Sequence, residues 1–540
     1  MDTDEAFCYH RIAFKQAPHI SKLIRNYLSG EIPKPLYSQS PNIKGLLAQA
    51  AIKKKHFSYR TELNKALKQQ YQRCLFDKVE GQNVLENIDL LSKENTLTIT
   101  TGHQACLGGG PLYTFYKIIS AISTCKKLNQ LDPQNQYVPI FWMATEDHDW
   151  EEAKHFFFEE EKWVYDQEVN GPVGRVSTEG MKEWLKTFAA HLPPGQVTNE
   201  IIEHLEHAYL KHNNWADATR QWAHDLFGQH GLIVIDGDDA ELKKLFAPVM
   251  LAECTQSFAM SDTTHCSKIL EENGFQAQVH PAQINIFYMG DGARTYVERT
   301  TSGYNLNGLS VTEEELQQIL EERPQDFSPN VVMRPLYQEW ILPNIAYFGG
   351  PGELAYWFQL SDIFRRFSTP FPVLLLRHGF ALLEEKSKQR YEKLNTTLLD
   401  LSPKIWKETW VKKHAQVRLH LDEEKTKIDR IFSDLEQLAG QTDGSMMGAV
   451  RAQRAKQMKG LDKLEKKLMR AEKRFHVESM NQIEVLSQSL YPTGIPQERH
   501  DSLWQWWSAI GKNPLEMIIN IADTDAPPED FVYITLKANS

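Results

Sequence analysis

Runs of apolar and β-compatible residues occur at four places along the chain, and each predicts a buried strand. The runs are Leu97–Thr100, Val138–Met143, Leu232–Ile235 and Val373–Leu376. Strands that show no apolar–polar alternation are typical of a parallel sheet with both faces covered by helices. The pattern therefore predicts an α/β fold with a Rossmann-like parallel-sheet core.

Each predicted strand ends in polar, mostly ionisable residues. The four endings are Thr101-Gly102-His103-Gln104, Thr145 to Asp149, Asp236 to Asp239, and Arg377-His378. In doubly wound sheets the ligand crevice lies at the carboxyl ends of the strands, so we expect these endings to converge on one site.

The segment Thr96–Lys117 combines a strand, a glycine-rich turn at 108–110 and a helix from Leu112 to about Leu128. Pro111 suits the first turn of that helix. This arrangement presents backbone N–H groups and a helix dipole to an anion, although an ordinary strand–helix connection has the same glycines. His103 could contact a phosphate, act as a general acid or be structural, and Lys117 could reach a phosphate or face solvent. The candidate binding residues here are Thr101, Gly102, His103, Gln104, Gly109, Gly110, Tyr113 and Lys117.

A second glycine turn, Phe348-Gly349-Gly350-Pro351-Gly352-Glu353, precedes a predicted helix over Leu354–Phe364. Its Gly-Gly-Pro repeats that of the first turn, so two helix N-termini could hold two anions or two ends of one ligand. A tight turn with proline at a helix start explains it equally well. The candidate binding residues are Gly349, Gly350, Gly352 and Glu353, together with Arg334 upstream and Arg377 downstream.

The densest ionisable cluster is Glu146-Asp147-His148-Asp149, directly after the second strand. Carboxylates with an imidazole could bind Mg²⁺, accept a proton or recognise an ammonium group, so these four residues are the catalytic candidates. An acidic helix start at Asp149 explains part of the cluster. Asp236 could bind ribose hydroxyls, but Asp-Gly-Asp turns also occur without a ligand. Zinc is less favoured at this cluster, because neighbouring residues of an extended segment point to opposite sides, and we expect no metal site beyond Mg²⁺ that accompanies a nucleotide.

The rest of the chain predicts insertions and a helical arm. Residues 1–380 form the core, with insertions at about 150–230 and 260–345; the second is predicted to be a small α+β unit that caps the crevice. Its expected strands are Gln276–His280, Asn285–Met289 and Thr295–Arg299, with a hairpin turn at Gly290–Gly292. Residues 381–490 predict an antiparallel coiled-coil arm, and 491–540 a C-terminal segment that returns to the core. The expected heptad seam is Leu421, Ile428, Ile431, Leu435 and Leu438, paired with Leu461, Leu464, Leu468, Ala471 and Phe475 across a break at Gly440–Gly444.

Composition excludes several classes of function. The net charge of −11 makes nucleic acid an unfavourable partner, and no apolar run is long enough to span a membrane. The first residues, MDTDEAFCYHRIAF, are acidic and lack a signal-peptide core, and the six cysteines have no CxxC spacing. We expect a cytoplasmic protein with reduced thiols. No Walker A, GxGxxG or GxSxG motif occurs.

Four motifs carry a resemblance to a known family. TTGHQACLGGGPLYTFYKIISAI, VPIFWMATEDHDWEE, YFGGPGELAYW and FPVLLLRHG, followed by a helical hairpin, resemble the BshC family of bacillithiol synthesis. The resemblance implies a Rossmann-like core with connecting-peptide insertions and a coiled-coil domain that dimerises. It implies a cytoplasmic ligase that forms an amide between the carboxyl group of cysteine and the amine of glucosaminyl-malate. The implied site is Thr101–Gln104, Gly109, Gly110 and Glu146–Asp149, with the Gly349–Glu353 turn.

Amide formation from a free carboxylate is uphill in water, so we expect ATP or another nucleotide, with Mg²⁺ accompanying it. The activated species is either an adenylate or an acyl phosphate, with the first glycine turn holding phosphates. Glu146 or Asp147 is expected to hold an ammonium group or Mg²⁺, and Asp149 or His148 to accept a proton. Two alternatives stay open: a nucleotide-binding scaffold that recruits partners through its coiled coil, and a nucleotidyltransferase acting on a sugar.

Overall fold

The computed structural model describes residues 7–17, 20–76, 80–290, 292–394, 403–415, 418–442 and 444–536. The chain divides into two compact units. The larger comprises His10–Phe380 and Glu498–Val532, and the smaller comprises Met1–Tyr9, Ala381–Gln497 and Tyr533–Ser540. Among the described residues, no helix has both the length and the apolar character that a membrane span requires.

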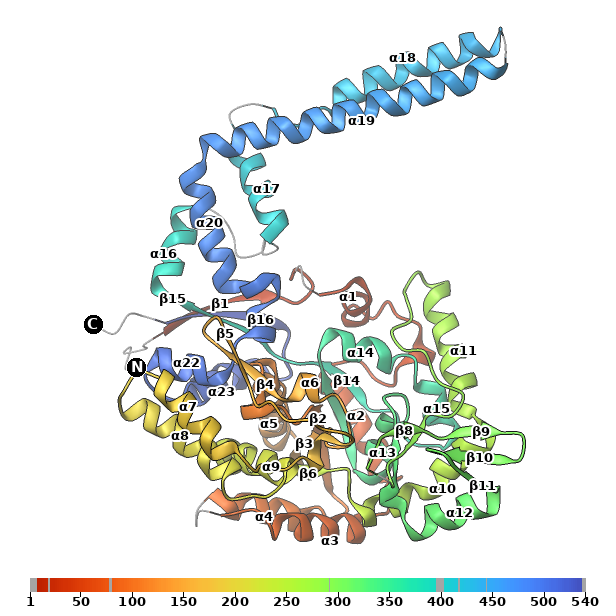
Figure 1. The fold of residues 1–540 in the computed structure, drawn as a ribbon, viewed down its shortest axis with the longest axis vertical. Coiled ribbons are helices and arrows are strands. Elements are labelled where there is room, and N and C mark those ends of the chain that lie inside the picture. Colours follow the sequence, from red (N-terminus) through yellow and green to blue (C-terminus); the bar gives the residue numbers. More distant parts are fainter. Residues whose placement is uncertain are drawn as a thin grey trace. The chain divides into compact units, whose positions relative to one another are not determined.

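A five-stranded, fully parallel sheet forms the centre of the larger unit (Figure 1). Its strands are β2 (Thr96–His103), β3 (Gln136–Met143), β6 (Ile233–Asp236), β13 (Asn344–Gly349) and β14 (Val373–Leu376). They lie in the order β14-β13-β2-β3-β6, and every neighbouring pair is parallel. The chain thus starts in the middle, builds outward to one edge, and then crosses back to build toward the other. This is the Rossmann-like topology, and its switch point lies between β2 and β13.

The sequence predicted four of these strands and missed β13, the neighbour of β2 at the switch point. Polar side chains of β2 are buried there because they pair with β13. The hydroxyls of Thr98 and Thr100 donate to Asn344 Oδ1 over 3.2 and 2.8 Å, and Thr101 Oγ1 donates to the carbonyl of Phe348. These partners satisfy three hydroxyls of a strand that is buried along its whole length.

Helices pack around this sheet. Those of the larger unit outside the insertions are α1 (Lys22–Leu28), α2 (Ile43–Lys54), α3 (Arg60–Tyr71), α4 (Glu80–Leu90), α5 (Tyr113–Leu131), α14 (Pro351–Trp357), α15 (Ser361–Arg366), α22 (Leu503–Ile510) and α23 (Leu515–Asp523). Helix α5 contacts β2, β3 and β13, and α2 contacts β13 and β14. Apolar side chains of α2, α5 and four strands form a fully buried core cluster that includes Leu46, Ile99, Ala121, Phe348 and Leu375.

The first insertion contains a β-hairpin followed by helices. Its elements are α6 (Trp150–Ala153), β4 (His155–Phe158), β5 (Glu161–Val164), α7 (Met181–His191), α8 (Gln196–Tyr209) and α9 (Trp215–Phe227). The sequence located this insertion, and its β-hairpin was not predicted.

The second insertion is the expected mixture of helices and short strands. Its elements, taken from the end of β6, are α10 (Ala240–Gln256), α11 (Phe258–Glu272), β7 (Ile286–Tyr288), β8 (Thr295–Tyr296), β9 (Glu298–Thr300), β10 (Gly303–Leu306), β11 (Leu309–Val311), α12 (Glu313–Glu322), β12 (Phe327–Pro329) and α13 (Arg334–Ile341). The predicted hairpin exists as the antiparallel pair β7–β8, although Asp291 in its turn lies outside the described residues. The strand predicted over Gln276–His280 is wrong. The side chain of Gln359 accepts the backbone N–H groups of Gln278 and Val279 there, in place of a neighbouring strand.

The smaller unit contains α16 (Glu385–Lys393), α17 (Pro403–His414), α18 (Asp422–Gly440), α19 (Gly444–Phe475) and α20 (Val477–Leu490). Helices α18 and α19 pack as an antiparallel hairpin, as predicted, although Asp443 of the connecting turn lies outside the described residues (Figure 1). Helix α21 (Gln497–His500) and strands β1 (Phe7–Ala13), β15 (Gly379–Glu384) and β16 (Asp530–Leu536) lie where the chain passes between the units; the strands form a sheet in the order β1-β16-β15.

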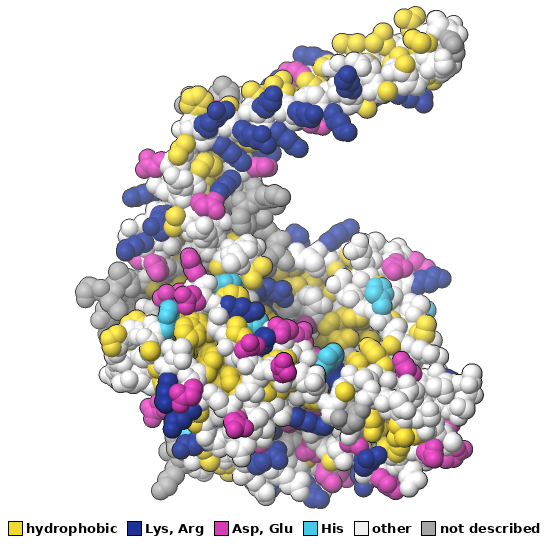
Figure 2. All heavy atoms as spheres, in the orientation of Figure 1, with side chains coloured by type: hydrophobic (Ala, Val, Ile, Leu, Met, Phe, Trp, Pro, Cys, Tyr) yellow, Lys and Arg dark blue, Asp and Glu magenta, His cyan; other side chains and the backbone are white. Residues whose placement is uncertain are grey.

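The predicted heptad seam of the hairpin needs correction. Ile431, Leu435 and Leu438 of α18 are 56, 42 and 59% exposed, so they do not lie between the helices. Ion pairs bridge α18 and α19 instead, including Arg454–Asp429 at 2.6 Å and Lys425–Glu465 at 2.6 Å. Figure 2 shows hydrophobic side chains exposed along this arm.

Candidate active site

A cavity of about 360 Å³ opens at the carboxyl ends of β2 and β3 and beside β13. It therefore lies at the switch point of the sheet, where doubly wound folds bind their ligands. The core contributes Gly102, His103, Gln104, Trp142, Ala144, Glu146, Asp147, His148, Tyr347, Glu353 and Tyr356 to its lining. The second insertion contributes Phe287, Arg294, Tyr296, Pro329, Asn330, Val331 and Arg334.

The structure brings some of the predicted residues to this cavity and places others elsewhere. Eight of them line it: Gly102, His103, Gln104, Glu146, Asp147, His148, Arg334 and Glu353. The others are Thr101, Gly109, Gly110, Tyr113, Lys117, Asp149, Asp236, Gly349, Gly350, Gly352 and Arg377. Contacts within the protein occupy most of these groups.

The first glycine turn does not offer its N–H groups to the cavity. The N–H of Gly108 donates to the hydroxyl of Tyr209 over 2.8 Å, and those of Gly109 and Gly110 donate to carbonyls within the turn. All three glycines are buried and have positive φ, which fixes the turn in this closed form. Pro111 precedes helix α5 rather than lying in its first turn. The structure thus corrects the expectation that this turn binds an anion through its backbone.

Lys117 lies beneath the cavity and joins two of its walls. Its ammonium donates to the carbonyl of Gly102 over 2.8 Å and pairs with Glu353 at 2.6 Å. Glu353 also accepts from Tyr347 Oη and from the N–H of Gly350. Burial raises the pKa of Glu353, but Lys117 and these donors outweigh it and hold the pKa below its usual range. The second helix N-terminus is therefore capped by a carboxylate of the protein itself.

His103 borders the cavity as a neutral ring. Its pKa lies well below the usual range, first because the ring is buried and then because Lys117, Arg377 and Arg499 are near. The ring packs edge-on against Tyr113 at 4.8 Å between centroids. A neutral, buried imidazole fits a contact role better than that of a general acid.

The four residues of the acidic cluster have four different environments. Glu146 is buried and forms an ion pair with Lys243 at 2.8 Å, and Lys243 also pairs with Asp238 at 2.6 Å. Asp149 caps helix α6 by accepting the N–H of Glu152. Asp147 and His148 line the cavity with side chains that are 36 and 55% exposed, so these two members of the cluster are the most accessible to a ligand there.

Asp147 and His148 meet Arg294, which sequence reasoning missed. Asp147 Oδ2 accepts from Gln104 Nε2 over 2.5 Å, and Arg294 Nη1 lies 2.9 Å from His148 Nδ1 and 3.6 Å from Asp147 Oδ1. The guanidinium also stacks on Phe287 at 4.0 Å. The side chain of Arg294 is only 8% exposed, yet its Nε has no partner among the described residues. A buried N–H without an acceptor suits a ligand oxygen.

Two further candidates have structural partners, and a third is exposed away from the cavity. Arg377 donates both terminal nitrogens to Glu498 over 2.8 and 2.6 Å. Asp236 accepts from Thr145 Oγ1, and its burial together with the nearby Asp238 raises its pKa to about 6. Gly352 is exposed on helix α14, away from the cavity lining.

A second, acidic groove adjoins the cavity and shares Gln104, Asp147 and His148 with it. Its remaining acidic groups are Asp149, Glu151, Glu152, Asp166 and Glu168, and Lys154 is its one lysine or arginine among the described residues that line it. Burial, reinforced by Asp149 and Asp147, raises the pKa of Glu152. The groove thus favours a cationic group, while the cavity side of Asp147 presents guanidinium groups to an anionic one.

Comparisons with known proteins divide the chain close to the boundary between its two compact units. The N-terminal Rossmann-like domain of bacillithiol biosynthesis BshC matches residues 8–378, and the C-terminal coiled-coil domain of BshC matches residues 380–527. A protein of Flavobacterium johnsoniae is 39% identical, with 94% of this chain and 98% of that protein covered. Proteins of Flavobacterium psychrophilum and Christiangramia forsetii are 38 and 36% identical, each with 95% of this chain and 96% of the relative covered. All three relatives carry the name "Putative cysteine ligase BshC".

Proposed function

This chain belongs to the BshC family of ligases in bacillithiol biosynthesis, and on that premise we propose that it joins the carboxyl group of cysteine to the amine of glucosaminyl-malate. The product of this reaction is an amide that carries a free thiol. The proposal rests on the family for the class of reaction and on the cavity for the way the two substrates meet.

The observation that carries the proposal is the change of charge across Asp147. On the cavity side, Arg294 and Arg334 present guanidinium groups, and the Nε of Arg294 is buried without an acceptor. On the groove side, carboxylates gather around Glu152. An anionic substrate group on one side and an amine on the other would meet at Asp147 and His148, which is the arrangement that amide formation needs.

ATP is the proposed source of activation, because a free carboxylate does not form an amide spontaneously in water. Bound ATP would supply the free energy and the phosphate-containing leaving group, and Mg²⁺ would enter with it. The first glycine turn does not fit its phosphates, because the N–H groups of residues 108–110 are already paired. The unpartnered Nε of Arg294 does fit a phosphate or carboxylate oxygen.

Asp147 and His148 are the residues we assign to the amine. Asp147 is held in place by the amide of Gln104, so its carboxylate can orient a substrate ammonium group. His148 is half exposed beside it and can accept the proton that the attacking amine loses. Glu146 and Asp149 lose their proposed roles, because Lys243 holds the first and the start of helix α6 holds the second.

Purified full-length protein tests the proposal when it is incubated with ATP, cysteine and glucosaminyl-malate. We expect a thiol product of the amide mass, with release of either AMP or ADP. Asp147→Asn and His148→Asn should lower turnover at least tenfold with the fold retained. Glu183→Gln, a change of an exposed carboxylate on α7 outside the groove and the cavity, is the matched control. Absence of the thiol product under every nucleotide condition would overturn the assignment.

We also propose that the chain is a homodimer through its coiled-coil hairpin. Ile431, Leu435 and Leu438 recur at the spacing i, i+4 and i+7, so they form one apolar stripe on α18. Their exposure in a single chain supports a partner helix on this face.

A further inference from the structure

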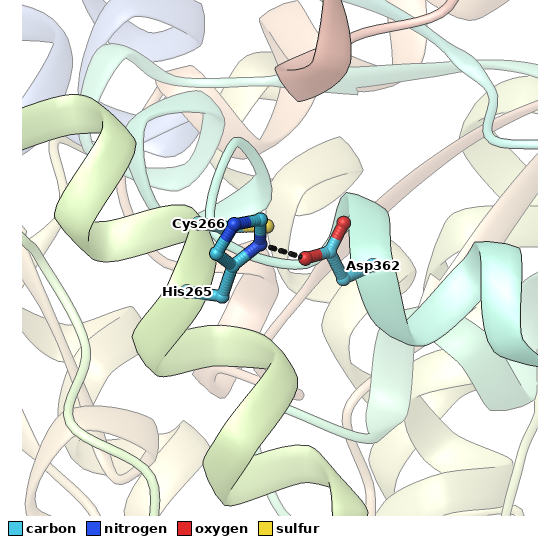
Figure 3. Close-up of side chains that lie close together, drawn as sticks. All are labelled: His265, Cys266 and Asp362. Atoms are coloured by element: carbon cyan, nitrogen blue, oxygen red, sulfur yellow. Dashed lines mark hydrogen bonds and ion pairs between the residues drawn. The ribbon is translucent and has the colours of Figure 1, made fainter.

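Helices α11 and α15 bring three metal-ligating side chains together at a place that is not part of the cavity lining. His265 and Cys266 belong to α11 of the second insertion, and Asp362 belongs to α15 of the core (Figure 3). One ligand atom from each residue lies within 4.8 Å of the others. The two helices pack directly against each other, so this proximity is a property of the fold.

The contacts of the three residues already resemble those of a ligand set. His265 Nδ1 lies 2.5 Å from Asp362 Oδ2, and the two side chains face each other in Figure 3. Cys266 is buried, forms no disulfide, and has its sulfur 3.4 Å from Ser361 Oγ. The other carboxylate oxygen of Asp362 pairs with Arg365. Ligating carboxylates are held in this way by outer partners.

A nucleophilic role for Cys266 fits the structure less well. Burial raises the pKa of its thiol, and the hydrogen bond to Ser361 and the charge of Arg365 offset this only in part. The free thiol therefore stays protonated at neutral pH, and a protonated thiol is a poor nucleophile. A bound cation would stabilise the thiolate directly.

The donor set selects a class of metal. Nitrogen, sulfur and oxygen together suit zinc and its transition-metal neighbours, whereas calcium and magnesium prefer oxygen alone. One thiolate and one carboxylate balance the charge of a divalent ion. The side chain of His265 is 62% exposed, which leaves room for water as a fourth ligand.

We propose that His265, Cys266 and Asp362 bind one zinc-class divalent ion that links the second insertion to the Rossmann-like core. Binding replaces the thiol proton of Cys266, which passes to solvent. The ion also replaces the hydrogen bond between His265 Nδ1 and Asp362 Oδ2, so these two atoms move apart to about 3.3 Å while the sulfur approaches them. The ion fixes α11 against α15. The same insertion supplies Arg294 to the cavity. The metal therefore stabilises the packing of this insertion on the core, and with it the position of Arg294.

Metal content and cobalt spectroscopy on the full-length chain test the proposal. After removal of loosely bound ions, we expect one zinc per chain by mass spectrometry. Replacement with Co²⁺ should produce a near-ultraviolet thiolate-to-cobalt absorption band. Cys266→Ser should abolish that band, and His265→Gln and Asp362→Asn should each weaken zinc binding at least tenfold. Cys8→Ser removes a partly exposed thiol elsewhere and is the control that should leave the band unchanged.

Three results would overturn the proposal: low zinc content, a persistent cobalt band, and unchanged zinc affinity without His265. The first is a zinc content below about 0.2 ions per chain after the protein has been incubated with zinc at about 10 μM, which is tenfold above a dissociation constant of about 1 μM. The second is a cobalt band that persists in Cys266→Ser. Because the ring of His265 is exposed, His265→Gln should fold normally, and unchanged zinc affinity in that variant would show that the cluster is only a hydrogen-bonded His–Asp pair.

Discussion

Replacing Lys117 with methionine removes the cation that joins the end of β2 to the start of α14. The side chain of Lys117 is 2% exposed and that of its partner Glu353 is 28% exposed. Breaking a fully buried pair by removing one partner costs about 3–5 kcal/mol, because the other charge stays buried. The partial exposure of Glu353 and its remaining donors reduce this, so we expect a loss of about 2–4 kcal/mol in the free energy of unfolding.

Urea denaturation followed by tryptophan fluorescence measures this loss, since Trp142 and Trp357 are buried in the core. Lys126→Met is the matched control. Lys126 lies on the same helix and pairs with Asp523, but its side chain is 58% exposed, so its loss should cost below about 1 kcal/mol. Adding Glu353→Gln to Lys117→Met should recover part of the loss. If Lys117→Met costs no more than Lys126→Met, the buried pair does not stabilise the floor of the cavity.

Three other changes have defined outcomes. Asp236 binds its proton more tightly in the folded chain, with a pKa of about 6 against 3.8. Raising the pH from 4 to 7 should therefore destabilise the natural protein by about 2.4 kcal/mol relative to Asp236→Asn, and parallel stability–pH curves would contradict this. Gly109→Ala should lower the melting temperature and cost about 2–4 kcal/mol in the free energy of unfolding, because φ at Gly109 is +84° and the new Cβ would lie 2.4 Å from the ring of Phe115. Gly352→Ala, in open space on α14, is the control and should leave the melting temperature unchanged. Leu438→Glu should convert a dimer into a monomer in light scattering after size exclusion, and an unchanged mass would place any dimer contact elsewhere.

The strands that could be predicted are those made of uninterrupted apolar residues, because such residues indicate burial by themselves. Val138–Met143 and Val373–Leu376 are uninterrupted apolar runs, and both are strands of the parallel sheet. Strand β13 escaped prediction because it begins at Asn344, directly after a proline, and ends in glycines. Its polar first residue is buried only because Thr98 and Thr100 donate to it. That pairing joins residues almost 250 positions apart, so no local pattern shows it.

The antiparallel coiled-coil hairpin was predicted from its length and heptad pattern, but the helix faces that lie toward each other were not. Heptad periodicity shows which residues share a face, and it does not say which partner covers that face. In α18 the ion pairs of Lys425 and Asp429 lie toward α19, while Ile431 and Leu438 are exposed. An apolar stripe can thus serve an interface outside the hairpin, and the sequence of one chain cannot distinguish the two.

For the candidate site, the sequence located the strand endings but not the residues that neutralise them. Glu146 is an attractive catalytic carboxylate until Lys243, almost 100 residues later, pairs with it. Arg294 follows a hairpin turn in an insertion and has no motif around it. Its significance depends on Phe287, against which it stacks, and on the absence of an acceptor for its Nε among the described residues. Both are properties of the folded chain.

At both helix N-termini that first suggested anion binding, the protein itself occupies glycine N–H groups. We therefore assign the anion-binding role to the second insertion. At the first, Tyr209 and two carbonyls of the turn take the glycine N–H groups; at the second, Glu353 takes the N–H of Gly350. These N–H groups are therefore not free to bind a substrate. The buried guanidinium N–H without an acceptor that lines the cavity belongs to Arg294, which the β7–β8 hairpin positions. If the cavity binds a carboxylate or phosphate, Arg294→Gln should therefore raise KM for the anionic substrate by about tenfold or more, whereas glycine-turn variants should act through stability alone.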